Sequence, residues 1–344
     1  MKKAVAEGEV SELEVTDHVR RILRAIFATG LYDHPIVRQV PDVESGFAVA
    51  KSIAEKSIVL LKNSNHVLPL NPSSVHTVVL IGGHANIGVL TGGGSAQVDS
   101  PGGSPVPPPP AGPDPLSEFM RPEWLSDAPL SALRKEFGTG KISYVSGNDL
   151  EQAVSAARAA DVAIVFAYQW ESENLDLPTL NLSADQNRLI ESVAAVNAHT
   201  VVVLETGSPV TMPWVDKIAG VIEAWYPGIR GAEALAEILT GAVNPSGKLA
   251  ITFPRSDSDL PHPTLVVPPP ASVPHLDAAG GDISKFMSLV AKGLPPFQIY
   301  YDEGLKVGYK WYDTGNKPVL FPFGFGLSYT TFAYYQEYRR ARGH

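Results

Sequence analysis

The sequence of 344 residues has no cysteine, no excess of positive charge and no long uninterrupted apolar run. Without cysteine, the chain can form no disulfide, use no catalytic thiolate and bind no metal through sulfur. Its net charge of -9 provides no basic field to displace counterions from phosphates, which argues against a nucleic-acid partner. No apolar segment reaches the length of a transmembrane helix, so we expect no membrane partner.

The N-terminus, Met1-Lys2-Lys3-Ala4, also lacks the long apolar core of a secretory signal peptide. Any export signal would have to lie upstream of these residues. The absence of cysteine is compatible with the cytoplasm and equally with a bacterial periplasm or secretion. The compartment therefore stays open.

The first pattern present is an amphipathic helix, predicted over residues 10 to 29 and ended by Gly30. Such an apolar stripe needs a surface to pack on. That surface is either this chain's own core or a segment outside these residues. The stripe consists of Val15, Val19, Ile22, Leu23, Ile26 and Phe27.

From about residue 46 the sequence alternates between helical patterns and short runs rich in valine and isoleucine. Near-continuous apolar strands alternating with helices are typical of a parallel sheet covered on both faces. The sequence therefore predicts an α/β fold, a three-layer α/β/α sandwich with a mostly parallel sheet, plus a leading helix and a short β-rich tail. The predicted helices span residues 46–61, 150–160, 184–196 and 232–239, and the predicted strands 77–81, 141–145, 161–167, 200–204 and 220–224.

The distinctive loops follow the predicted strands. Ligands of open parallel sheets bind outside the carboxyl ends of the strands, so we expect these loops to share one rim. Their glycines, carboxylates and aromatic rings suit a carbohydrate, because ring faces accept sugar C–H surfaces and carboxylates hold hydroxyls or transfer protons. The loops cover residues 92–97, 170–176, 205–209 and 225–228.

Other site chemistries have weaker support. The run Gly92 to Gly94 lacks the G-x-G-x-x-G spacing and leads into proline-rich coil instead of a helix, which disfavours a nucleotide and leaves a plain turn as the alternative. Ser208 does not lie in a G-x-S-x-G elbow. The histidines show no metal-ligand spacing. We expect no metal and no cofactor.

The acidic loop is the best candidate for proton transfer. Glu171, Glu173 and Asp176 crowd a short segment behind Trp170. Like charges beside apolar surface raise the pKa of at least one carboxyl group, and a raised pKa suits a general acid. A solvated acidic loop without function is the alternative on charge alone.

A series of motifs then resembles the sandwich domain of family 3 glycoside hydrolases, in order along nearly the whole chain. These motifs are Ser57 to Asn63 followed by Leu68-Pro69-Leu70, the loop Gly92 to Ser95, the loop Trp170 to Glu173, Thr206 to Val210, Ala224 to Gly228, Asn244 to Leu249, Thr252 to Pro254, Gly308 to Tyr312, and Phe321 to Phe332.

The resemblance implies a retaining, exo-acting β-glycosidase, typically a β-glucosidase, with a β-glucoside or oligosaccharide substrate. It implies that Glu173, with Asp176 three residues later, is the general acid/base, with Glu171 as the fallback. Ser95, Gly94, Trp170 and Asp176 are expected to bind substrate. The nucleophile of the family is an aspartate on a (β/α)8 barrel, and no aspartate here matches it. The barrel partner would lie in a longer parent or another chain; a homodimer is left open.

The resemblance also implies a partition of the chain. Residues 1–40 resemble the last helix of the barrel and a linker, and residues 41–255 the sandwich, with a proline-rich excursion at 101–125. Residues 256–318 are an irregular connection, and residues 319–344 the start of a fibronectin-like β module. We expect the chain alone to be inactive. A non-catalytic carbohydrate-binding or scaffold module of the same fold is the competing hypothesis.

Overall fold

The computed structural model describes residues 1–98, 122–173, 177–264 and 300–331. The chain divides into two compact units, Met1–Val43 and Glu44–His344. Asp176, most of the excursion at 101–125, much of the connection at 256–318 and the end of the tail lie outside the described residues. The proposed partition into domains stays a prediction.

The first unit contains α1 (Lys2–Ala6) and the amphipathic helix α2 (Glu12–Ala28). Ser11 begins α2 as a capping box: its side chain accepts from the N–H of Glu14, and the Glu14 carboxylate accepts from the N–H of Ser11. Gly30, at φ +71°, follows the helix. No residue of α2 is buried, and Ile22 is 61% exposed. Within the unit Met1–Val43 itself, the apolar stripe of α2 is therefore not covered by other residues.

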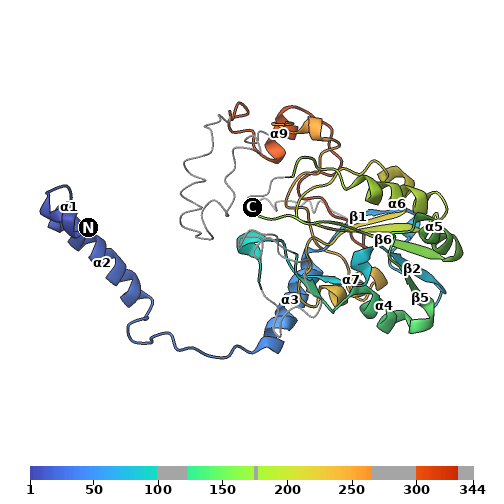
Figure 1. Ribbon diagram of the computed structural model, residues 1–344, viewed down its shortest axis with the longest axis horizontal. Helices are drawn as coiled ribbons and strands as arrows, with labels where there is room; N and C mark the ends of the chain where they lie inside the picture. Colours follow the sequence, from blue (N-terminus) through green and yellow to red (C-terminus); the bar gives the residue numbers. More distant parts are fainter. Residues whose placement is uncertain (99–121, 174–176, 265–299, 332–344) are drawn as a thin grey trace, which may run out of the picture. The chain divides into compact units, whose positions relative to one another are not determined.

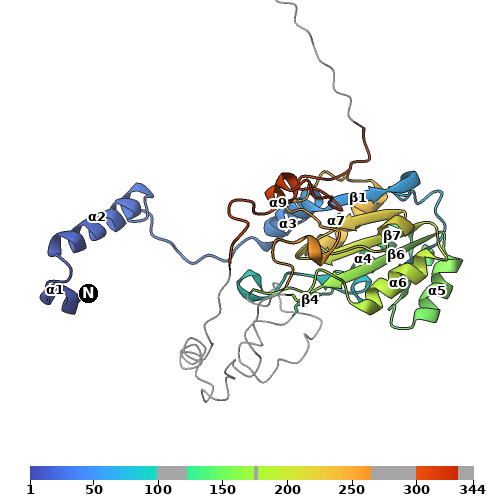
Figure 2. The same ribbon diagram turned by 90° about the horizontal axis from the view of Figure 1, so that it is seen from above.

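A six-stranded sheet forms the centre of the second unit, in the order β1-β8-β7-β6-β2-β5. All neighbours are parallel except β1 and β8. Figure 2 shows β1 at one edge, with β7 and β6 further in. The strands are β1 (Val59–Asn63), β2 (Val78–Ile81), β5 (Ile142–Val145), β6 (Val162–Gln169), β7 (Thr200–Thr206) and β8 (Gly220–Glu223).

Helices cover both faces of the sheet, which confirms the predicted three-layer sandwich (Figure 1). One face packs against α3 (Val43–Ser57), α4 (Pro129–Phe137) and α7 (Gly231–Thr240). The other face packs against α5 (Leu150–Ala159) and α6 (Ala184–Ala194). Central strand residues such as Ile164 and Val202 are fully buried on both sides, as expected for near-continuous apolar strands.

The strand order places the chain reversal beside β2. The chain passes from β2 to β5 on one side and then crosses to β6 on the other, so the crossovers diverge between β2 and β6. The crevice outside such a switch point is where open parallel sheets bind ligands. The glycine loop is reached from β2 through the short strand β3 (Gly88–Val89), which pairs with β4 (Trp124–Leu125), and the acidic loop follows β6 directly.

The predicted helix over residues 46–61 is wrong at its C-terminal end. The helix α3 ends at Ser57, and residues from Val59 form the edge strand β1. Leu60 pairs with Ile222 of β8, and its carbonyl accepts from the N–H of Leu327 in the tail. The apolar run is therefore buried between sheet neighbours that lie far away in the sequence, which local periodicity does not reveal.

The helices α4 and α9 (Tyr309–Thr314) were not among those predicted from the sequence. The tail packs back on the sandwich, where Phe321 pairs with Phe253 and buries its ring beside it. Among the described residues, no helix combines the length and the apolar character that crossing a bilayer requires.

Candidate active site

The end of β6 is held firmly before the acidic loop begins. Gln186, near the start of α6, accepts from the N–H of Tyr168 at 2.7 Å and donates to its carbonyl at 2.9 Å. The hydroxyl of Tyr226 donates to the carbonyl of Gln169 at 2.6 Å. Because these contacts fix the last strand residues, the loop starts from a defined position on the rim.

The glycine loop and the acidic loop, which were expected to share one rim, pair with each other. The N–H of Gly93 donates to the carbonyl of Glu171 at 2.9 Å, and the N–H of Glu173 donates to the carbonyl of Gly93 at 3.5 Å. This contact leaves no room for side chains. A Cβ on Gly93 would lie 2.4 Å from the Trp170 ring, and one on Gly94 would lie 2.5 Å from the Cβ of Glu173.

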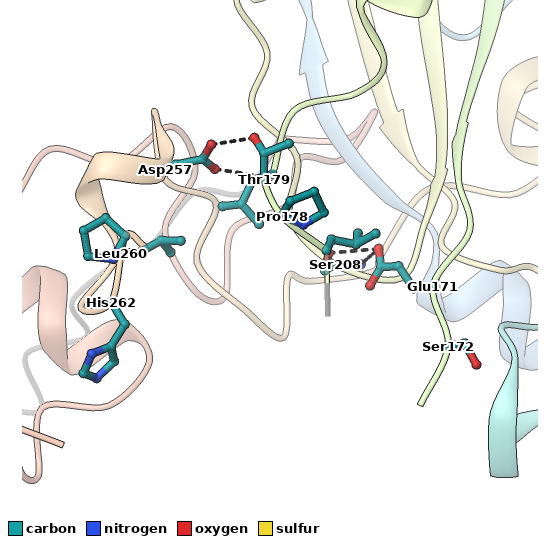
Figure 3. Close-up of a pocket in the computed structure, with 11 residues that line it drawn as sticks. Glu171, Ser172, Pro178, Thr179, Ser208, Asp257, Leu260 and His262 are labelled. Atoms are coloured by element: carbon teal, nitrogen blue, oxygen red, sulfur yellow. Dashed lines mark hydrogen bonds between the residues drawn. The ribbon is translucent and has the colours of Figure 1, made fainter. Parts of the chain in front are cut away.

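Glu171 is anchored by the loop after β7. Its Oε1 accepts from the N–H of Gly207 at 3.1 Å, and from the N–H and the hydroxyl of Ser208, both at 2.9 Å. Figure 3 shows the carboxylate turned toward Ser208. Three donors on one oxygen fix this side chain and tie the acidic loop to the neighbouring strand's loop.

Glu173 is held by Ser95 and remains exposed to solvent. Its Oε2 accepts from the N–H of Ser95 at 2.9 Å and from the Ser95 hydroxyl in a short hydrogen bond. These donors, the hydroxyl first and the backbone second, lower the pKa of Glu173 below its ordinary value. For Glu173 the expectation of a raised pKa is therefore wrong: hydrogen bonds to the ionised form outweigh burial, which is slight at this exposed position.

Burial raises the pKa of two other carboxyl groups, at the ends of β7 and β8. Glu205 is 1% exposed and its two oxygens have no partner among the described residues. Glu223 is fully buried and accepts from the N–H of Trp225 at 2.8 Å. In both cases desolvation moves the pKa well above its ordinary value. Both groups lie at the carboxyl ends of their strands, and neither was chosen as a site residue, although Glu205 begins the predicted rim loop 205–209.

Two pockets adjoin the acidic loop and share Glu171 and Ser172 in their walls. The first encloses about 540 Å³, within the range of small-ligand pockets, and contains Glu173. The second, shown in Figure 3, encloses about 390 Å³ and extends to Asp257 and His262. The first pocket is lined by Leu90, Thr91, Gly92, Gly93, Ala96, Glu171, Ser172, Glu173, Gly207, Trp225 and Tyr226.

Two aromatic residues of that lining were part of a predicted rim loop but were not chosen as site residues. Trp225 is half-buried and has a left-handed backbone conformation, with φ +58°. The ring of Tyr226 lies beside Gly92 and Gly207, where a Cβ on either glycine would be 3.1 Å from the ring. Their position directly after β8 was the available signal, because that position puts them on the carboxyl-end rim. The aromatic content expected of a carbohydrate site is thus present.

The candidate residues Glu171, Glu173, Gly94, Ser95 and Trp170 all lie within these paired loops, whereas Asp176 falls outside the described residues. The glycine loop leads into a single 3-10 turn, Gly94–Ala96, rather than an α-helix. Its Ser95 N–H already binds a carboxylate of the chain itself, which leaves little basis for phosphate binding there. Within the described part of the chain, no three His, Asp or Glu side chains cluster as metal ligands.

A family model described as the glycosyl hydrolase family 3 C-terminal domain matches residues 58–329. The chain belongs to glycoside hydrolase family 3. This family 3 chain is 36% identical, over 338 residues, to thermostable beta-glucosidase B of Acetivibrio thermocellus. It is 35% identical, over 305 residues, to an exo-alpha-(1->6)-L-arabinopyranosidase of Bifidobacterium breve.

The fold is shared with solved family 3 enzymes. DesR, a beta-glucosidase from Streptomyces venezuelae solved in complex with D-glucose, matches 96% of this chain with a TM-score of 0.70 and 28% identity. The match covers 51% of the DesR chain. The match to the Acetivibrio enzyme covers 96% of this chain and 39% of that enzyme. The match to the Bifidobacterium enzyme covers 85% of this chain and 34% of that enzyme. The family 3 chain therefore spans between about a third and two fifths of the length of these two curated relatives.

Proposed function

We propose that the chain is the acid/base-bearing part of a retaining, exo-acting β-glycosidase that removes terminal sugars from β-glucosides or short oligosaccharides. The observation that carries this proposal is the state of Glu173. Its carboxylate is exposed, lines the larger pocket of the rim and is oriented by Ser95. A proton donor must be accessible to the reacting oxygen and fixed in direction, and Glu173 meets both requirements.

In the proposed first step, an aspartate outside this chain attacks the anomeric carbon. The bond from that carbon to the leaving oxygen breaks, and Glu173 gives its proton to that oxygen. In the second step, Glu173 takes a proton from water, the resulting hydroxide attacks the anomeric carbon, and the aspartate leaves as a carboxylate. Retention of configuration requires the two carboxyl groups to lie about 5–5.5 Å apart.

Glu173 is preferred over Glu171 as the acid because the two carboxylates differ in the hydrogen bonds that they already accept. Oε1 of Glu171 already accepts three hydrogen bonds from Gly207 and Ser208, which suits an anchor. Glu173 accepts only from Ser95, on Oε2, and its Oε1 has no partner among the described residues. The free oxygen is the one that can carry the proton to the substrate.

The protonation of Glu173 should change when substrate and nucleophile arrive. In the free chain the hydrogen bonds of Ser95 lower its pKa, so the group is ionised near neutral pH. A bound sugar would desolvate the carboxyl group, and the aspartate opposite would add a like charge. Both effects raise the pKa, which favours the acid form needed for the first step.

The substrate class rests on the aromatic lining and on the relatives. Trp225 and Tyr226 offer ring surface beside Glu173, suitable for the C–H face of a pyranose. Relatives named beta-glucosidase favour a glucoside, and the relative named arabinopyranosidase indicates that this fold also serves other pyranosides. Gly94, Ser95, Trp170 and Asp176 remain proposed as the substrate-binding residues of this chain.

The test combines this chain with the part of the Acetivibrio beta-glucosidase that it does not match, and measures hydrolysis of a β-glucoside that releases an alcohol or a sugar, a leaving group that needs a proton. We expect no activity from either piece alone. We expect activity from the pair, and a loss of about 10²- to 10⁴-fold with Glu173→Gln. Glu136→Gln, on the exposed face of α4, is the matched control and should change nothing.

If the pair is active and indifferent to Glu173→Gln, the acid/base assignment fails. The chain is then a scaffold or carbohydrate-binding module of the same fold. Hydrolysis by the 344-residue chain alone would instead refute the need for an outside nucleophile.

A further inference from the structure

Ser95 directs both of its hydrogen-bond donors at a single oxygen of Glu173. The backbone N–H lies 2.9 Å from Oε2, and the hydroxyl makes a shorter contact with the same atom. A carboxylate gripped on one oxygen by two donors cannot rotate freely. Oε1, which has no partner among the described residues, is therefore left in a fixed direction.

The loop that carries Ser95 is itself well determined. Gly94, at φ +77°, starts a 3-10 turn that the N–H of Gln97 closes on the carbonyl of Gly94 at 3.0 Å. The hydroxyl of Thr91 donates to the carbonyl of Ala96 at 3.0 Å and braces the turn from the other side. The direction of the Ser95 N–H thus follows from the backbone and does not depend on a rotamer.

The hydroxyl of Ser95 has one hydrogen and two lone pairs. Since its hydrogen is given to Glu173, Ser95 Oγ can only accept from a further group. A sugar hydroxyl that donates to Oγ would complete a chain of hydrogen bonds from the sugar, through Ser95, to the carboxylate. Such chains strengthen each member by polarisation.

We propose that Ser95 is a positioning residue for Glu173: it turns Oε1 toward the reacting oxygen and couples the orientation of the carboxyl group to a sugar hydroxyl donated to Oγ. This rests on the proposed acid/base role of Glu173. It assigns to Ser95 a role in addition to substrate contact, because the residue acts on the reaction through another side chain.

The charged surroundings of Glu173 leave Ser95 as the main influence on its ionisation. Glu173 makes no ion pair among the described residues. The other described carboxylate of its loop, Glu171, is bound to Gly207 and Ser208. The glycine loop on the opposite side, Gly92 to Gln97, carries no charged residue. Asp176 lies outside the described residues.

The first test titrates the side-chain carboxyl carbon of Glu173 by NMR in the 344-residue chain, assigned by its loss in Glu173→Gln. We expect a pKa below the ordinary value in the parent chain and an upward shift in Ser95→Ala. Ser95→Thr keeps a hydroxyl and should restore the low value. Ser172→Ala removes a neighbouring hydroxyl that has no partner in the described structure, and it should leave the pKa unchanged.

A second readout uses the active pair described above. Glu173 must be protonated to act as an acid, so kcat/KM falls as pH rises through its pKa. Ser95→Ala should move this basic limb to higher pH and lower the plateau of kcat/KM about tenfold, the usual effect of losing one hydrogen bond to a charged group. A merely structural role would lower the rate without moving the limb.

Each outcome bears on the inference. An unchanged Glu173 pKa in Ser95→Ala, in a chain whose backbone spectrum stays native, would overturn it. So would an unmoved basic limb in the active pair. If the pKa moves but activity does not depend on Glu173, the coupling to catalysis fails together with the proposed function, while the hydrogen bond itself is verified.

Discussion

Glu171 and Ser208 are joined by two hydrogen bonds: Oε1 of Glu171 accepts from the backbone N–H and from the hydroxyl of Ser208, both at 2.9 Å. The N–H of Gly207 adds a third donor at 3.1 Å. The contact joins the loop after β6 to the loop after β7, two residues before Glu173. The position of the proposed acid thus depends on a neighbouring carboxylate whose Oε1 already accepts three hydrogen bonds.

Glu171→Ala should therefore loosen the acidic loop and leave three donors without their acceptor. We expect a loss of about 1–3 kcal/mol in the free energy of unfolding, measured by urea denaturation. Glu136→Ala on the exposed face of α4 is the control and should change stability by less than about 0.5 kcal/mol. Equal stability of the two variants would show that the anchor contributes nothing.

Gly94→Ala should separate the two paired loops. The added Cβ would lie 2.5 Å from the Cβ of Glu173, and the backbone at φ +77° already disfavours any side chain. We expect a destabilisation of about 1–3 kcal/mol and the loss of the hydrogen bonds between Ser95 and Glu173. Gly83→Ala, where a Cβ meets nothing within 4 Å, is the matched control. A Glu173 NMR signal identical in both variants would contradict this account of the glycine.

His84 should make the fold sensitive to acid. Its ring stacks on Tyr168 with a centroid distance of 3.9 Å, and burial lowers its pKa from 6.5 to about 4. Between pH 6.5 and 4, His84 is therefore protonated in the unfolded chain but neutral in the folded chain. The free energy of unfolding consequently falls as the pH decreases through that window. The contribution amounts to about 3 kcal/mol at most.

The measurement compares the pH dependence of unfolding in the parent chain and in His84→Phe, which keeps a ring against Tyr168. The difference between the two curves isolates His84 from the other titrating groups. We expect it to change between pH 6.5 and 4 in favour of the variant. A difference that stays constant with pH would mean that His84 titrates normally.

Glu205 should act in the opposite direction. Its pKa is raised well above 4.5 by burial, so the folded chain keeps a proton that the unfolded chain releases. Stability is then lost as pH rises above 4.5, by about 1.4 kcal/mol per pH unit until the folded group ionises. Glu205→Gln stays neutral at all these pH values and should gain stability relative to the parent at pH 8 but not at pH 4. Parallel stability curves would contradict the prediction.

The parallel core of the fold was predictable because its strands are buried on both faces. Residues such as Ile164 and Val202 belong to continuous apolar runs, and such runs indicate buried parallel strands without knowledge of which strands lie beside them. The edge strand β1 was not predictable in this way. Its partners, β8 and the tail residue Leu327, lie far along the chain, and its apolar run continues the helical pattern of α3.

The features of the candidate site also divide into those that the sequence could predict and those that it could not. The loops that meet were predictable, because every parallel strand delivers its following loop to one rim. The ionisation of Glu173 was not, because it depends on the direction of the Ser95 N–H and hydroxyl rather than on how many carboxylates are near in sequence. The anchoring of Glu171 by Gly207 and Ser208 likewise required the register between two loops 36 and 37 residues apart.

The central claim is that Glu173 donates a proton to the departing oxygen, and leaving-group dependence tests it most directly. In the active pair, kcat/KM of Glu173→Ala is compared with that of the parent on two β-glucosides. One releases a phenol so acidic that it leaves without a proton, and the other releases an alcohol or sugar that needs one. The account predicts almost no loss on the first and a loss of about 10²- to 10⁴-fold on the second. Equal losses on both substrates, or no loss on either, would contradict it.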